Sequence, residues 1–162
     1  TQVAFQGVPD IRTLVFQGIP VMSMLRLPTR SSNGKANLHQ GAVGVGINMS
    51  TGLTVGGIWY DSPRRRHPDT GGSLMGIPIP EWDDILRLTA QCHDFTGLGF
   101  IGVDIVLDKH LGPLLLEINA RPGLSIQMAN RSGLLPRLRL IESLSELPHE
   151  LGARLVIARS FV

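Results

Sequence analysis

Cysteine, lysine, aromatic side chains and long hydrophobic runs are all scarce in this sequence. The single cysteine, Cys92, cannot form a disulfide within the chain, which favours a reducing cytosol over an oxidising compartment. No apolar run approaches the roughly 20 residues of a membrane-spanning helix. A net charge of +2 and an aromatic content of 5% also disfavour nucleic acid as a partner. We therefore expect a cytoplasmic protein that is not embedded in a membrane.

The residues that are present suit one ordinary globular core. The chain has 162 residues, 43% of them hydrophobic and only 17% charged, which predicts a single domain over 1–162 rather than a disordered tail. Of the 15 basic residues, only Lys35 and Lys109 are lysines. The remaining arginines suit planar, bidentate recognition of carboxylates and phosphates.

Hydrophobic periodicity and turn residues predict a mixture of strands and helices. We expect strands at 12–18, 19–27, 53–61, 99–108, 112–120 and 153–162, and helices at 79–97, 124–134 and 135–147. A long polar loop, 28–46, ends in GAVGVG, which fits close backbone packing better than phosphate binding. The RRRH run in the loop 62–73 fits a solvated surface, with phosphate or nucleic-acid contact as the alternative.

The segments 99–108 and 112–120 have the pattern of a hairpin. If Asp108 lies opposite Pro113, one face pairs only apolar residues, and the other face brings polar residues together. The apolar pairs are Ile101–Ala120, Val103–Ile118, Ile105–Leu116 and Leu107–Leu114, and the other pairs are Gly102–Asn119, Asp104–Glu117 and Val106–Leu115. Side chains alternate between the faces of a strand, so a slip of one residue would separate the two acids.

Two ionised carboxylates side by side on a sheet repel each other, so Asp104 and Glu117 need a shared proton, an arginine or a cation. Asp104, Glu117 and Asn119 form an oxygen-donor set that suits a hard cation such as Mg²⁺. The alternative is that Arg12 or Arg121 pairs with these acids and nothing else binds.

The motifs VDIVLD and LLLEINARPGL resemble the C-terminal core of the ATP-grasp ligases. PDIRTLVFQG and ANLHQGA resemble the Asp-Ile-Arg strand and the Asn-Leu-His loop of the glutamate-ligase branch, which includes the ribosomal-protein glutamate ligases. The run from Gly7 to Pro136 is most similar to the alpha-L-glutamate ligase-like proteins. The resemblance implies an α+β fold: a mostly antiparallel sheet with helices packed on one face, the C-terminal ATP-grasp subdomain.

The resemblance also implies a reaction and a set of roles. ATP would activate a carboxylate as an acyl phosphate, and an amine, such as that of an amino acid or peptide, would attack it. Asp104, Glu117 and Asn119 would bind Mg²⁺ or Mn²⁺, and Arg12 would act on the transferred phosphate. Two further sets of residues would bind substrate or nucleotide: Arg121 with Gly123 at a substrate carboxylate, and Asn37 with His39 near the phosphates.

The upstream subdomain of that family, with its nucleotide-binding lysines and glycine-rich lid, has no counterpart in this sequence. We therefore expect the chain to be the C-terminal portion of an ATP-grasp module in a longer protein, with a poor adenine pocket and little turnover of its own. Two other possibilities remain: a non-catalytic binding or scaffold module, and a same-fold enzyme that phosphorylates its substrate rather than ligating it.

Overall fold

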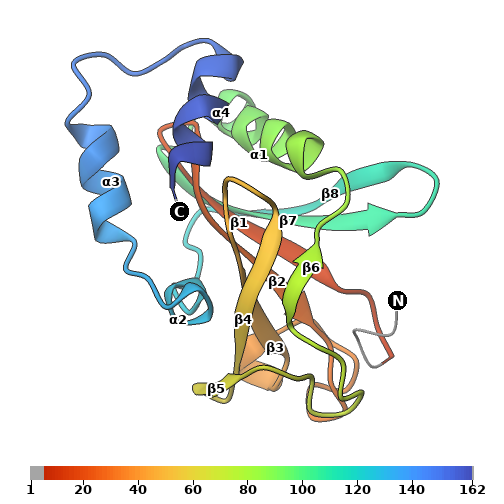
Figure 1. The fold of residues 1–162 in the computed structure, drawn as a ribbon. Coiled ribbons are helices and arrows are strands. Elements are labelled where there is room, and N and C mark those ends of the chain that lie inside the picture. Colours follow the sequence, from red (N-terminus) through yellow and green to blue (C-terminus); the bar gives the residue numbers. More distant parts are fainter. Residues whose placement is uncertain (1–5, 162) are drawn as a thin grey trace.

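The computed structural model describes residues 6–161, which form a single twisted sheet with helices packed against it (Figure 1). The strands are β1 (Asp10–Phe16), β2 (Ile19–Leu27), β3 (Val43–Ile47), β4 (Leu53–Trp59), β5 (Ser62–Arg64), β6 (Met75–Pro78), β7 (Phe100–Asp108) and β8 (Gly112–Asn119). The helices are the short 3₁₀ helix η1 (Leu38–Gln40) and α1 (Trp82–Thr96), α2 (Ile126–Asn130), α3 (Leu135–Glu142) and α4 (Leu151–Ser160).

Every strand pair in the sheet is antiparallel, in the order β5-β4-β3-β2-β1-β7-β8, with β6 paired to β4. The predicted α+β class with a mostly antiparallel sheet is therefore confirmed. β1 and β2 lie at the centre of the sheet, and all nine residues of β2 are buried. The tight turn between them has Gln17 and Gly18 at positive φ, as the two-residue hairpin connection requires.

The C-terminal segment is helical, so the strand predicted at 153–162 is wrong over its described residues. In α4 the buried residues Arg154, Leu155 and Ala158 follow the three- and four-residue spacing of a helix face. Arg154 donates both terminal nitrogens to the carboxylate of Asp94 at 2.8 Å, which ties α4 to α1. Among residues 6–161, no helix has the length and apolar character needed to cross a membrane.

The β7–β8 hairpin confirms the predicted register at its inner end and contradicts it at its outer end. Asp104 pairs with Glu117 and Gly102 with Asn119, as predicted. Beyond Asp104 a β-bulge leaves Leu116 without a partner residue on β7. The predicted pairs of the outer end are therefore wrong: Ile105 pairs with Leu115, Val106 with Leu114, Leu107 with Pro113 and Asp108 with Gly112.

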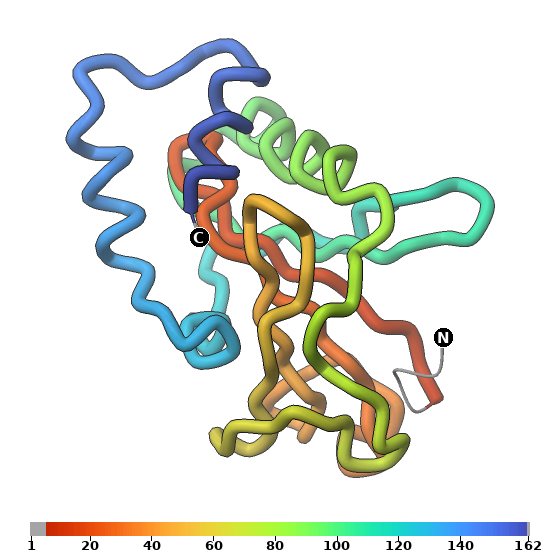
Figure 2. Tube along the Cα trace, in the orientation of Figure 1, coloured from red at the N-terminus to blue at the C-terminus, as the bar shows by residue number. Residues whose placement is uncertain are grey.

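The hairpin turn explains the shifted register. The carboxylate of Asp108 accepts hydrogen bonds from the backbone N–H groups of His110 and Leu111 at 2.8 and 3.0 Å, and Gly112 takes a positive φ of 73°. Figure 2 shows this hairpin extending away from the rest of the sheet. The apolar residues there are exposed, with Leu116 at 59%, so the turn and not the core sets the register.

Two glycines allow the chain after β8 to pack against the sheet. A Cβ on Gly102 would lie 2.6 Å from the Cβ of Pro122, and a Cβ on Gly46 would lie 2.6 Å from the backbone oxygen of Ala129 in α2. The segment GAVGVG therefore allows close packing, as its sequence predicted. The loop and α2 that follow Asn119 are held against the same face of the sheet as Asp104, because Gly46, Met24, Arg12 and Asp104 pair across successive strands.

The RRRH run has two parts with different environments. Arg64, Arg65 and Arg66 are exposed, and Arg64 lies over the ring of Trp59 at 5.4 Å. His67 is 1% exposed; its Nε2 lies 3.0 Å from the backbone oxygen of Pro28, and its Nδ1 accepts hydrogen bonds from two backbone N–H groups. His67 therefore fixes the loop.

Candidate functional site

Strand pairing places the predicted site residues in one row across the sheet. Arg12 of β1 lies opposite Asp104 of β7, and Asp104 lies opposite Glu117 of β8. Asp10, two residues before Arg12, lies on the same face and pairs with Arg26 of β2. We refer to these five residues, Asp10, Arg12, Arg26, Asp104 and Glu117, as the charged row.

Four residues of the charged row form a compact network of ion pairs. Arg12 donates Nε and Nη2 to the two carboxylate oxygens of Asp104 at 2.7 and 2.6 Å. Arg26 donates Nε and Nη2 to Asp10 at 2.5 Å each, and its Nη2 also reaches Asp104 Oδ2 at 2.8 Å. Asp104, Asp10 and Arg26 are 2%, 6% and 8% exposed. Such bidentate pairs hold the side chains in fixed positions.

The pKa values of Asp10 and Arg26 are both raised, but for different reasons. Burial raises the pKa of Asp10 above its ordinary value, although the hydrogen bond and charge of Arg26 oppose that rise. Burial acts to lower the pKa of Arg26, but the hydrogen bonds and charges of Asp10 and Asp104 together outweigh it and raise the pKa. Arg26 therefore stays charged at the centre of the network.

The other end of the row has no partner. Among the described residues, Glu117 makes no hydrogen bond or ion pair, and Asn119 Nδ2 is buried without a hydrogen-bond partner. A buried polar group without a partner is costly, so this amide is suited to meet a group that binds there. Of the ion pairs considered as the alternative to metal binding, the one between Arg12 and Asp104 forms, whereas the one between Arg121 and Glu117 does not.

The charged row borders a cavity of about 390 Å³. We call this the charged cavity. It is lined by Asp10, Arg12, Arg26, Ala36, Asn37, His39, Asp104, Leu116, Glu117 and Asn119. With its two arginines and three acids, the formal charge of the lining is −1 when His39 is neutral. A polyphosphate would therefore be better accepted together with a divalent cation than alone.

Oxygen atoms of the kind that Mg²⁺ prefers lie on two neighbouring strands, β7 and β8. Asp104 accepts three hydrogen bonds, and two carboxylate oxygens offer about four acceptor positions, so one position on Oδ1 is open. Glu117 is exposed and unpaired beside it. In residues 6–161 no three His, Cys, Asp or Glu side chains are grouped to hold a metal ion, so the third protein ligand would be the amide of Asn119.

Asn37 and His39 border the charged cavity from the loop before β3. Asn37 Oδ1 accepts the backbone N–H of His39 at 3.0 Å, and the Asn37 carbonyl accepts from Gln40 and Ala42. Asn37 thus caps η1 and sets the position of His39. Both side chains are exposed at the cavity, where a ligand can reach them.

Arg121 and Gly123 are not among the residues that line the charged cavity. Both are exposed in the loop that follows Asn119, and a Cβ on Gly123 would meet no atom within 4 Å. Arg121 makes no ion pair with the described residues, so its guanidinium remains available to a substrate.

Asp10 and Arg26 are site residues that the sequence analysis missed. Both carry a signal that could have identified them. Asp10 precedes Arg12 by two positions in one strand and so shares its face, and Arg26 is the one charged residue in the otherwise uncharged segment IPVMSMLRL. A lone charge in a buried strand calls for an opposite charge nearby.

Comparison with known proteins supports the ATP-grasp resemblance at the level of the superfamily. A family model described as sugar-transfer associated ATP-grasp matches residues 1–143. No curated protein matches the chain significantly. ATP binding and a general ATP-dependent, ligase-like function agree with this match, while the glutamate ligase-like branch stays a prediction. The chain belongs to the sugar-transfer associated ATP-grasp family.

Proposed function

We propose that the charged cavity is the metal- and phosphate-binding part of an ATP-dependent carboxylate–amine ligase. The observation that carries the proposal is the unpaired end of the charged row: Glu117 has no partner, and Asn119 Nδ2, a donor that suits a phosphate oxygen rather than the metal ion, is buried and unsatisfied. A sheet that needed these residues only for stability would be expected to pair them, as it pairs Asp10 and Arg26.

The proposed roles follow from the charges. Mg²⁺ would be bound by Asp104, Glu117 and Asn119 and would neutralise the phosphates. Arg12 would contact an oxygen of the transferred phosphoryl group, and its hydrogen bonds to the proposed metal ligand Asp104 support that role. In the reaction the substrate carboxylate takes the terminal phosphoryl group of ATP and ADP leaves. The amine nitrogen then bonds to the carbonyl carbon, and phosphate leaves as the nitrogen loses a proton.

A scaffold function is the second candidate, because the Asp10–Arg26–Asp104–Arg12 network leaves little of Asp104 exposed. In that case the arginines would neutralise the acids and no metal would bind. The two candidates differ in what they expect of Glu117, which is a ligand in the first and a solvated edge residue in the second.

Calorimetric titration with Mg²⁺–pyrophosphate and with Mg²⁺–ADP separates these candidates. We expect Mg²⁺-dependent binding of both probes, since the charged cavity provides contacts to phosphate rather than to adenine. Glu117→Gln should weaken it by at least about tenfold, because even residues that only orient a metal ligand contribute that much. Glu142→Gln, which neutralises an exposed acid on α3, is the matched control and should bind normally.

Two results would contradict the ligase proposal. Pyrophosphate binding that is equally tight with EDTA and with Mg²⁺ would show a simple anion site. Unchanged binding by Glu117→Gln would remove this residue from the site and favour the scaffold function. If the site is confirmed, release of ADP in the presence of a panel of carboxylates and amines would then identify the substrates.

A further inference from the structure

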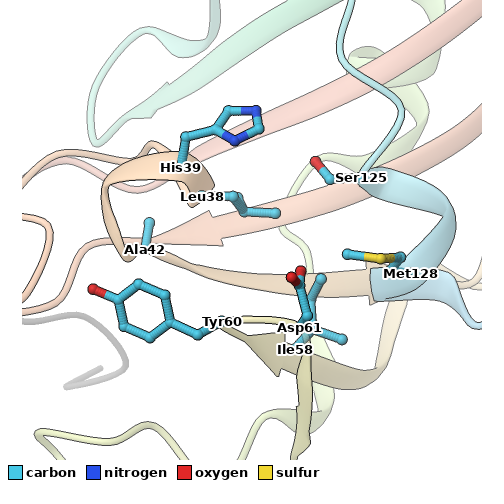
Figure 3. A pocket seen from close by; sticks show the side chains of 8 residues that line it. All are labelled: Leu38, His39, Ala42, Ile58, Tyr60, Asp61, Ser125 and Met128. Carbon is cyan, nitrogen blue, oxygen red and sulfur yellow. The ribbon is translucent and has the colours of Figure 1, made fainter.

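A second cavity lies next to the charged cavity, and His39 lines both. Its volume is about 290 Å³, close to the lower end for small-molecule sites. Figure 3 shows its residues, which come from three places: η1 with Ala42 two residues after it, the end of β4 with its turn, and α2 with the residue before it. We call this the second cavity.

The chemistry of the second cavity differs from that of the charged cavity. Leu38, Ala42, Ile58 and Met128 provide apolar surface. The polar lining residues are His39, Tyr60, Asp61 and Ser125, with no arginine or lysine among them. Its one formally charged side chain is therefore an acid without a guanidinium group in the lining, whereas two guanidinium groups accompany the three acids of the charged cavity. This composition opposes phosphate and favours a cation that has an apolar part.

Asp61 is the residue that gives the second cavity its charge. It makes no hydrogen bond or ion pair with the described residues. In Figure 3 its carboxylate points toward the space between Leu38, Ser125 and Met128. Tyr60 and Asp61 both have positive φ, 44° and 60°, in the tight turn between β4 and β5, so the backbone there is held in an uncommon conformation.

The walls of the second cavity are set by close packing. A Cβ on Gly41 would lie 2.4 Å from the hydroxyl of Tyr60, and one on Gly44 would lie 2.8 Å from Leu38. On the other side, α2 presents Met128 and is held against Gly46. These contacts fix the three segments relative to one another, so the cavity is formed without a ligand.

We propose that the second cavity binds the amine substrate: a small alkylammonium compound whose charge pairs with Asp61 and whose apolar part packs on Ile58 and Met128. Its nitrogen gives one proton to solvent water before it attacks the acyl phosphate, and loses a second proton as the amide forms. The inference rests on the proposed ligase function, which needs an amine beside the phosphate-binding cavity. His39, which both cavities share, marks the boundary across which the two substrates would meet.

Titration of the ¹⁵N-labelled chain with two four-carbon probes tests this inference without ATP. The probes are n-butylammonium and 1-butanol, which have similar size and differ in charge. We expect n-butylammonium to shift the backbone amide signals of Asp61, Ser125 and Met128, with affinity in the millimolar range for so small a ligand. 1-Butanol should bind about fivefold more weakly, the contribution of an exposed ion pair.

Asp61→Asn is the decisive variant, because asparagine tolerates the positive φ at this position and keeps the shape of the side chain. It should bind n-butylammonium about fivefold more weakly and 1-butanol as well as the original chain does. Glu142→Gln, in which an acid is neutralised elsewhere, should change neither.

Three outcomes would overturn the inference: no shifts in the second cavity up to the solubility limit of the amine, equal binding of amine and alcohol, or full amine affinity in Asp61→Asn. These readouts do not depend on Mg²⁺ or pyrophosphate. Absence of Mg²⁺–pyrophosphate binding to the charged cavity would therefore contradict the proposed function and leave the second cavity as an amine-binding site without a role as substrate site, whereas absence of amine binding would contradict this inference alone.

Discussion

Both ends of the charged row carry carboxylates, but the surroundings of those carboxylates differ. At the β2–β1–β7 end, Asp10, Arg26, Asp104 and Arg12 are joined by five hydrogen bonds and are largely buried. At the β8 end, Glu117 is exposed and unpaired. A buried charge is costly unless it is paired, whereas an exposed charge can stay unpaired and bind a ligand. The first end should therefore matter for stability and the second for function.

The largest effect we expect comes from the paired end. Arg26→Met keeps the length of the side chain but leaves Asp10 without its bidentate partner and Asp104 without its second arginine. Removal of one partner of a buried pair should lower the free energy of unfolding by about 3–5 kcal/mol. Chemical denaturation checks this value.

Arg65→Met is the matched control, because Arg65 is exposed in the loop after β5 and should change the stability by less than about 0.5 kcal/mol. Equal stabilities for the Arg26 and Arg65 variants would show that the buried network is not needed for folding. The comparison between the two ends of the row would then lose its basis.

The sequence predicted most of the fold and the inner part of the site because burial left strong patterns there. Ile101, Val103 and Ile105 alternate with Gly102 and Asp104, and this alternation placed Asp104 opposite Glu117 correctly. At the exposed end of the same hairpin the apolar side chains do not pack in the core, so pairing apolar residues does not predict the register. The carboxylate of Asp108 sets the turn there, and the predicted pairs were wrong.

Two further features depend on tertiary structure and leave no local pattern in the sequence. The segment around Arg26 has the pattern of an apolar strand, and nothing local shows that β2 lies beside β1 with Asp10 opposite Arg26. At the C-terminus, alternation in ARLVIARSFV suggested a strand, but contacts with α1 and β2 stabilise a helix. Tertiary packing decided both positions.

A second ion pair, between Asp94 and Arg154, shows how pairing affects the pKa of an aspartate that is not buried. Asp94 is about half exposed, and its hydrogen bond to Arg154 lowers its pKa from the ordinary 3.8, whereas burial raises the pKa of Asp10. A lowered pKa adds stability above pH 3.8 that is lost as the pH falls through the folded-state value. In Asp94→Asn, which has no carboxylate at this position, that loss of stability at acidic pH should be absent.

Denaturation curves recorded between neutral and acidic pH measure that effect. We expect the difference in stability between the original chain and Asp94→Asn to be small, since solvent screens the exposed side of the pair, and to shrink further as the pH falls below 3.8. A difference that stays constant over the whole range would mean that the lost hydrogen bond, and not the titration of Asp94, accounts for it.

Substitution of Glu117, at the unpaired end, should give the smallest change in the free energy of unfolding. Whether that free energy rises or falls tells what the residue is for. Glu117 lies directly opposite Asp104, and like charges in that position destabilise a sheet. Because Arg12 and Arg26 already offset the charge of Asp104, Glu117→Gln should raise the free energy of unfolding only toward the lower end of about 0.2–1 kcal/mol. The same variant should lose Mg²⁺–pyrophosphate affinity. A residue whose neutralisation stabilises the fold and weakens binding is retained for binding, because the fold alone gains from its removal. A fall in stability would instead show that Glu117 supports the sheet, and the two ends of the row would then be alike.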